Sequence, residues 1–225
     1  MTIAEHIAEI RATLPKEATL VCVSKFQPEE SLREAYAAGE RDFGESRVQE
    51  MLEKHRNLPD DIRWHFIGHL QTNKVRQIVP FVSLIHGVDS LRLLDEINKE
   101  ALRAKRVVNV LLEVHVAEEE TKSGFAPDEI AGLQPLVELN HAAPFLREYP
   151  GVNICGIMGM ASNTDDEEQV RREFRMLATI QRNLFPHGGV LSMGMSHDYR
   201  IALEEGANMV RIGSSIFGER CPKGC

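Results

Sequence analysis

The sequence predicts an α/β fold made of one domain, a (β/α)8 barrel of the TIM type with an extra helix at the N-terminus. Eight short apolar runs alternate with longer amphipathic runs, which is typical of parallel strands joined by helices. The chain has 225 residues, and one such barrel commonly uses roughly 200–250 residues. No linker, internal repeat or low-complexity segment divides the sequence, so residues 1–225 are expected to form a single domain.

The strands are expected where apolar residues gather in short runs. These runs are Thr19–Ser24, Arg41–Gly44, Ile62–Ile67, Val82–His86, Val107–Val116, Val152–Met158, Val190–Met193 and Met209–Ile212. An open, doubly wound sheet is the alternative. That fold usually has a glycine-rich turn after its first strand, whereas this chain has Ser-Lys-Phe-Gln-Pro over residues 24–28.

Helices are expected where apolar residues recur every three or four positions. The clearest are Pro28–Ala38, Arg47–His55, Ser90–Lys105, Asp165–Leu184 and His197–Glu205, and the extra N-terminal helix is Thr2–Arg11. Pro28 suits a first helical turn, and Gly39 and Gly206 suit the residue that follows a helix.

The composition argues against several functions. A formal net charge of −8 disfavours a nucleic-acid surface, which needs clustered lysine and arginine. The longest apolar run, Val107–Val116, contains three polar residues, so we expect no membrane span, and the charged N-terminus is unlike a signal peptide. The four cysteines are scattered without paired ligand spacing, so we expect no metal site and a reducing, cytoplasmic environment.

A lysine follows the first predicted strand. Strand alternation places Lys25 on the same face as Val21 and Val23, which is the inside of the barrel. At the carboxyl end of a strand it would lie at the active-site end of the fold, nearly buried in an apolar lumen. Burial favours the neutral amine, the form that attacks aldehydes. The alternative is a lysine whose stem follows the rim while its ammonium group stays in water.

The last two strands supply a candidate anion site. In this fold, phosphate groups usually bind at the loops after strands seven and eight. Gly213 would let backbone N–H groups approach an anion, and Ser196 and Ser214 add hydroxyl donors near helix starts. The alternative is ordinary helix capping by the serines.

Two further segments contain reactive side chains. His65 and His69 could share a metal ion only if Gly68 turned the chain, so we favour His65 at the barrel mouth, with Asn73 and Lys74 beginning a helix. In the segment 118–124, Lys122 follows three glutamates and could reach an aldehyde bound at the mouth. The alternative for that segment is a solvated acidic loop.

Several motifs together resemble a known family, the pyridoxal 5′-phosphate (PLP) homeostasis proteins, also called PLP-binding proteins. The matching segments are Val23–Lys25, Asp42–Glu45, His65–Lys74, Lys122–Gly124 and Leu191–Ser196. They occur in the family's order and extend over almost the whole chain. The resemblance implies a barrel similar to the N-terminal domain of alanine racemase. It also implies a Schiff base between Lys25 and PLP, a phosphate held by Ser196, Gly213 and Ser214, and Arg211 facing the pyridine nitrogen.

Two positions depart from the family pattern. Ser46 and His115 stand where the family usually has asparagine. We expect these changes to affect contacts around the rim and to leave Lys25 and the phosphate loop unchanged.

The expected role is that of a cofactor carrier with no catalytic residue of its own. Arg211 can only donate hydrogen bonds, so it would keep the pyridine nitrogen unprotonated and weaken PLP as an electron sink. Racemases of similar fold take a catalytic tyrosine from an additional β-domain, which is not expected in a chain that stops at Cys225. The alternatives are a weak amino-acid racemase and a Schiff-base aldolase or lyase acting on a phosphorylated substrate. A monomer that passes PLP to apo PLP-dependent enzymes is the expected form.

Overall fold

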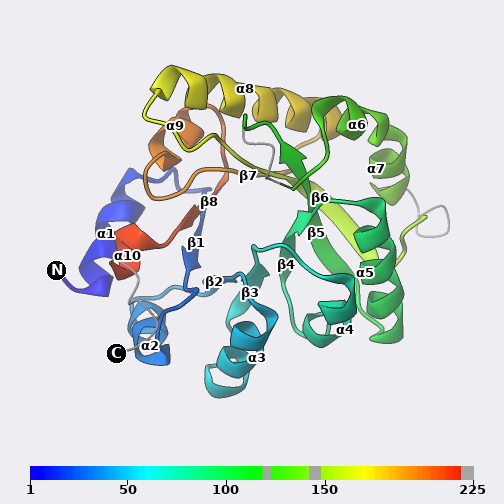
Figure 1. The fold of residues 1–225 in the computed structure, drawn as a ribbon. Coiled ribbons are helices and arrows are strands. Elements are labelled where there is room, and N and C mark those ends of the chain that lie inside the picture. The colour runs from blue at the N-terminus through cyan, green and yellow to red at the C-terminus, as the bar shows by residue number, and fades with distance from the viewer. Residues whose placement is uncertain (119–122, 142–147, 219–225) are drawn as a thin grey trace.

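Eight parallel strands close into a barrel in sequence order in the computed structural model (Figure 1). The structure describes residues 1–118, 123–141 and 148–218. The strands are β1 (Thr19–Val23), β2 (Asp42–Glu45), β3 (Arg63–Phe66), β4 (Leu84–Val88), β5 (Val108–His115), β6 (Val152–Met160), β7 (Val190–Ser192) and β8 (Met209–Ile212). Strand β1 pairs with β2 on one side and β8 on the other, so the predicted barrel is confirmed and the open sheet is excluded.

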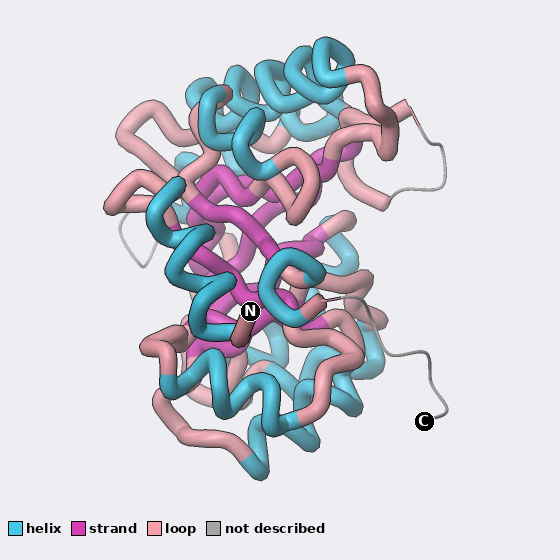
Figure 2. Tube along the Cα trace, turned by 90° about the vertical axis from the view of Figure 1, so that its left-hand side faces the viewer, coloured by secondary structure: helices cyan, strands magenta, loops and turns pink. Residues whose placement is uncertain are grey.

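Helices surround the strands on the outside, as the tube in Figure 2 shows. They are α1 (Ile3–Thr13), α2 (Glu29–Ala37), α3 (Val48–Asn57), the 3-10 turn η1 (Thr72–Lys74), α4 (Val75–Ile78), α5 (Leu91–Arg103), α6 (Pro127–Gly132), α7 (Gln134–His141), α8 (Glu167–Leu184), α9 (Tyr199–Glu204) and α10 (Ser214–Phe217). Helix α1 is the expected extra helix, and it lies beside α2 and α10. None of the described helices is both long and apolar enough to span a bilayer.

Local signals mark several helix ends where the sequence predicted them. Gly39 and Gly206 each follow the C-cap residue of a helix and adopt a φ of +102°, a conformation that residues with a Cβ rarely adopt. Thr2 caps α1 by accepting a hydrogen bond from the Glu5 N–H, and the Glu5 carboxylate accepts one from the Thr2 N–H. Pro28 is the N-cap of α2 rather than part of its first turn.

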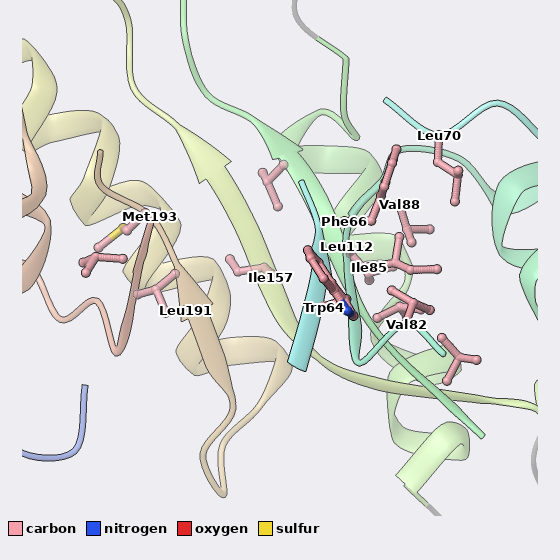
Figure 3. Close-up of a cluster of buried hydrophobic side chains, with 14 of the residues drawn as sticks. Trp64, Phe66, Leu70, Val82, Ile85, Val88, Leu112, Ile157, Leu191 and Met193 are labelled. Atoms are coloured by element: carbon pink, nitrogen blue, oxygen red, sulfur yellow. The ribbon is translucent and has the colours of Figure 1, made fainter. Parts of the chain in front are cut away.

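The largest apolar layer lies between the strands and the helices. Trp64 and Phe66 of β3, Ile85 of β4 and Leu112 of β5 belong to it, and each is at most 1% exposed (Figure 3). Burial of one such side chain stabilises the fold by about 1.5–3 kcal/mol. A separate small cluster fills part of the lumen with Val21, Leu84, Leu111, Met158 and Met209.

The lumen is more polar than the sequence predicted. Alternation along the strands points His65, His86, Ser192 and Arg211 inward, and all four are at most 4% exposed. The prediction of an apolar lumen around Lys25 was therefore wrong for this half of the interior. These buried polar groups hydrogen-bond to one another, which offsets their desolvation.

Candidate functional site

A cavity of about 300 Å³ opens at the carboxyl ends of the strands. Its apolar lining includes Val23, Ile67 and Met160. The five residues predicted to hold a cofactor, Lys25, Ser196, Arg211, Gly213 and Ser214, all line it as well. The volume is at the lower end of the range for small-molecule sites, roughly 300–1,000 Å³.

Lys25 lies in the tight turn that follows β1 rather than in the strand itself. The Gln27 N–H donates to the Ser24 carbonyl at 3.0 Å, which closes the turn around Lys25. The lysine is half-buried, so the expectation of near-complete burial was wrong. Because the chain leaves the strand at Val23, the turn carries the Lys25 side chain to the rim of the cavity.

Side chains of helix α3 form hydrogen bonds with the backbone of this turn. Phe26 has a φ of +66°, which is uncommon for a residue with a large side chain and persists only where neighbouring contacts fix it. The Phe26 N–H donates to Glu50 Oε1 at 2.6 Å, and Lys54 Nζ donates to the Ser24 carbonyl at 2.8 Å. The residues on both sides of Lys25 are therefore tied to α3.

A buried carboxylate completes this support. Glu45 Oε1 accepts hydrogen bonds from Ser24 Oγ at 2.6 Å and from Lys54 Nζ at 2.8 Å. Burial raises the pKa of Glu45 to about 7; Lys54 works against this rise and Glu50 adds to it. Sequence reasoning missed Lys54, although its spacing from Met51 and Val48 places it on the buried face of α3.

The loop after β7 lines the part of the cavity that contains the candidate anion site, Ser196, Gly213 and Ser214. Gly194 has a φ of +93°, and Asp198 Oδ1 accepts the Met195 N–H at 2.5 Å. Ser196 Oγ then accepts the backbone N–H groups of Gly213 and Ser215 at 3.3 and 3.4 Å. Two N–H donors thus already converge on an oxygen beside the cavity, and phosphate oxygens are acceptors of the same kind.

Arg211 also lines the cavity, and its side chain is buried. Its Nη1 donates to the carbonyl and the hydroxyl of Ser192 at 2.9 and 2.7 Å, and its Nη2 donates to the Gly159 carbonyl at 3.1 Å. Burial lowers the pKa of Arg211 to about 10, so the guanidinium remains charged at neutral pH. The guanidinium N–H groups that are not used in these three hydrogen bonds can donate to a ligand in the cavity.

Of the auxiliary residues, His65 and Asn73 are not among the described residues that line the cavity. His65 is buried below it, with Nδ1 2.9 Å from His86 and Nε2 3.0 Å from Asp42, so the predicted position at the mouth was wrong. Asn73 lies in η1, where a helix was expected to begin, and it lines a different, exposed hollow beside His69. Lys122 lies outside the described residues.

The remaining predictions concern metals and the two family departures. Within the described ranges, no three His, Cys, Asp or Glu side chains are grouped as metal ligands. Among the described residues that line the cavity, neither Ser46 nor His115 occurs. The Ser46 backbone lies against Gly68, where a Cβ would come within 2.6 Å of the Ser46 carbonyl oxygen. The Nδ1 atom of His115 is buried without a partner among the described residues.

Known proteins resemble the chain in both sequence and fold. Residues 1–221 match the family model for the N-terminal domain of alanine racemase. A pyridoxal phosphate homeostasis protein of Aquifex aeolicus is 44% identical, over 90% of this chain and 87% of that protein. The protein of that name from Escherichia coli K12 is 32% identical over 97% of each chain.

Solved structures extend this similarity. PipY of Synechococcus elongatus PCC7942, solved with PLP bound, superposes with a TM-score of 0.84 at 34% identity, over 96% of this chain and 100% of PipY. The alanine racemase of Clostridium difficile 630 superposes with a TM-score of 0.77 at 18% identity, over 99% of this chain and 57% of the racemase, and at that identity it shows only the shared fold.

Proposed function

The chain belongs to the family of the pyridoxal phosphate homeostasis proteins, and from this premise we propose that it binds PLP covalently through Lys25 and carries it. The task is PLP homeostasis in the cytoplasm, as a monomer, with apo PLP-dependent enzymes as recipients. Catalysis is not part of the role.

The observation that carries the proposal is that a lysine, an anion-suited loop and a buried arginine line one cavity. PLP supplies an aldehyde that an amine can capture reversibly, together with a phosphate group and a pyridine nitrogen. Lys25 would bond to the aldehyde carbon. Ser196, Gly213 and Ser214 would hold the phosphate, and Arg211 would donate to the ring nitrogen.

The positions of the described tyrosines favour a carrier role over racemase activity. A racemase needs an acid–base group on each face of the cofactor. The Tyr199 hydroxyl lies 3.2 Å from the Thr13 hydroxyl and accepts from Arg200, and Tyr199 is absent from the described lining of the cavity. The hydroxyls of Tyr36 and Tyr149 donate to Asp61 and Asp95 on the outside of the barrel. The described tyrosines are therefore engaged away from the cofactor position.

Borohydride reduction tests the attachment. The purified protein is loaded with PLP and reduced, and peptide mass spectrometry should then locate the pyridoxyl group on Lys25. Lys25→Ala should lose both the adduct and the visible absorption band, whereas the exposed-lysine control Lys99→Ala should keep both. An adduct found only at other lysines of the wild-type protein would refute the proposal. Protein that never absorbs in the visible with PLP would favour the aldolase alternative.

A further inference from the structure

A continuous chain of hydrogen bonds crosses the lumen from Arg211 to the amino ends of β2 and β3. Arg211 Nη1 lies 2.7 Å from Ser192 Oγ, and Ser192 Oγ lies 3.1 Å from His86 Nδ1. His86 Nε2 lies 2.9 Å from His65 Nδ1, and His65 Nε2 lies 3.0 Å from Asp42 Oδ1. Strands β4 and β7 are not neighbours in the sheet, so the bond between His86 and Ser192 passes through the interior.

The outer end of this chain is fixed by charge. Arg63, whose side chain is 56% exposed, donates to both oxygens of Asp42 at 2.7 and 2.5 Å. Burial alone would raise the pKa of Asp42, but the hydrogen bonds from Arg63 and His65 outweigh it and bring the pKa to about 2. At neutral pH Asp42 is therefore a carboxylate, which can only accept hydrogen bonds.

Each link then determines the next. Because Asp42 accepts, His65 carries a proton on Nε2, and when this is the only ring proton its Nδ1 accepts. In that tautomer of His65, His86 donates from Nε2 and accepts at Nδ1, and Ser192 donates its hydroxyl proton to His86. Burial lowers the pKa of His86 well below its ordinary value, and the positive charge of Arg211 acts in the same direction, so a neutral ring suits this position. Ser192 Oγ accepts from Arg211, which is always a donor.

We propose that Ser192, His86 and His65 form a hydrogen-bond relay, ordered from the Asp42 carboxylate, that positions Arg211 as a fixed donor to a ligand in the cavity. Ser192, His86 and His65 are thus positioning residues.

This inference rests on the proposed function in one respect only: it identifies the ligand group that Arg211 contacts as the pyridine nitrogen of PLP. The relay itself is tested without cofactor. In 15N-histidine-labelled apo protein at pH 8, NMR should show His65 and His86 as neutral rings protonated on Nε2, assigned by signals lost in H65N and H86N. A proton on Nδ1 of either ring overturns the relay, whether or not PLP binds. A protein with these tautomers but without PLP on Lys25 would instead refute the proposed function.

Ser192 gives the matched pair of variants for the loaded protein. Ser192→Ala removes the hydroxyl but keeps the backbone carbonyl that Arg211 also contacts, and Ser192→Thr keeps the hydroxyl. Ser192→Ala should shift the visible absorption band of bound PLP, alter its pH profile and speed PLP loss about tenfold, as expected for losing a hydrogen bond to a charged group. Ser192→Thr should restore the wild-type band and profile. If Ser192→Ala lowers only the melting temperature and leaves the spectrum of bound PLP unchanged, the hydroxyl is merely structural and the proposal fails.

Discussion

Replacing Asp42 with Asn should destabilise the fold through the loss of one buried charge. The Asp42 side chain is 10% exposed and accepts hydrogen bonds from Arg63 and His65. Asparagine keeps the shape and one acceptor oxygen, but it has no charge and turns an N–H donor toward the Arg63 guanidinium. The variant therefore removes the charge at the outer end of the relay with little change in volume.

The pKa of Asp42 gives the magnitude. Its ordinary value is 3.8, and in the folded protein it is about 2. At about 1.36 kcal/mol for each tenfold change in proton affinity, the carboxylate stabilises the native state by roughly 2 kcal/mol at pH 7. Since the pKa is lowered on folding, this contribution is complete well above pH 3.8, begins to shrink below about pH 5, and is lost as the pH falls toward 2. About half of it should be gone by pH 3.

Urea unfolding of both proteins between pH 7 and pH 3 measures this effect. The difference in unfolding free energy should stay near 2 kcal/mol down to about pH 5 and then shrink. Asp61→Asn is the matched control, because Asp61 also accepts from an arginine, Arg41, but its side chain is 57% exposed. That control should lose much less stability, and the loss should fall further in high salt. A difference for Asp42→Asn that does not change down to pH 3 would refute the reasoning.

Three other outcomes follow from the site. Arg211→Gln should shift the absorption of bound PLP and weaken its retention, and an unchanged spectrum would show that Arg211 does not contact the ring. Gly194→Ala should lower the unfolding free energy in urea by about 2 kcal/mol or more, because φ is +93° and the new Cβ would come within 2.6 Å of Ala202 Cβ. Gly188→Ala is the control, because Gly188 has a φ of +100° but no atom within 4 Å of the new Cβ. Its unfolding free energy should fall only by the cost of the strained backbone. Lys122→Ala should slow PLP transfer to an apo enzyme with binding at Lys25 unchanged, and equal transfer rates would exclude a role for Lys122.

The fold could be predicted because its signals are local. Each strand is a short apolar run, and every predicted strand is within two residues of its observed bounds. Helices α6, α7 and α10 were not predicted as helices, since they have only 6, 8 and 4 residues. Helices this short depend on tertiary packing more than on their own sequence pattern.

The cavity lining could also be predicted, but its support could not. Lys25 and Arg211 end up together because the carboxyl ends of parallel strands meet at one face of the barrel. The bonds from Lys54 to Ser24 and from His86 to Ser192 join residues 30 and 106 positions apart, and no local pattern specifies them. His86 was part of a predicted strand, yet only the closed barrel shows that its ring faces β7.

Two independent supports therefore hold the two ends of the proposed PLP site before any ligand arrives. Helix α3 fixes the turn that carries Lys25, and the lumen relay fixes Arg211. A site organised in advance loses little conformational entropy on binding, so it can hold a ligand without closing over it. Lys25 is only half-buried and Ser214 is exposed, so an incoming amine could approach the bond at Lys25 from solvent. An enzyme gains from excluding water around its reacting atoms, whereas a carrier must return its cargo, and the accessible rim suits the second requirement.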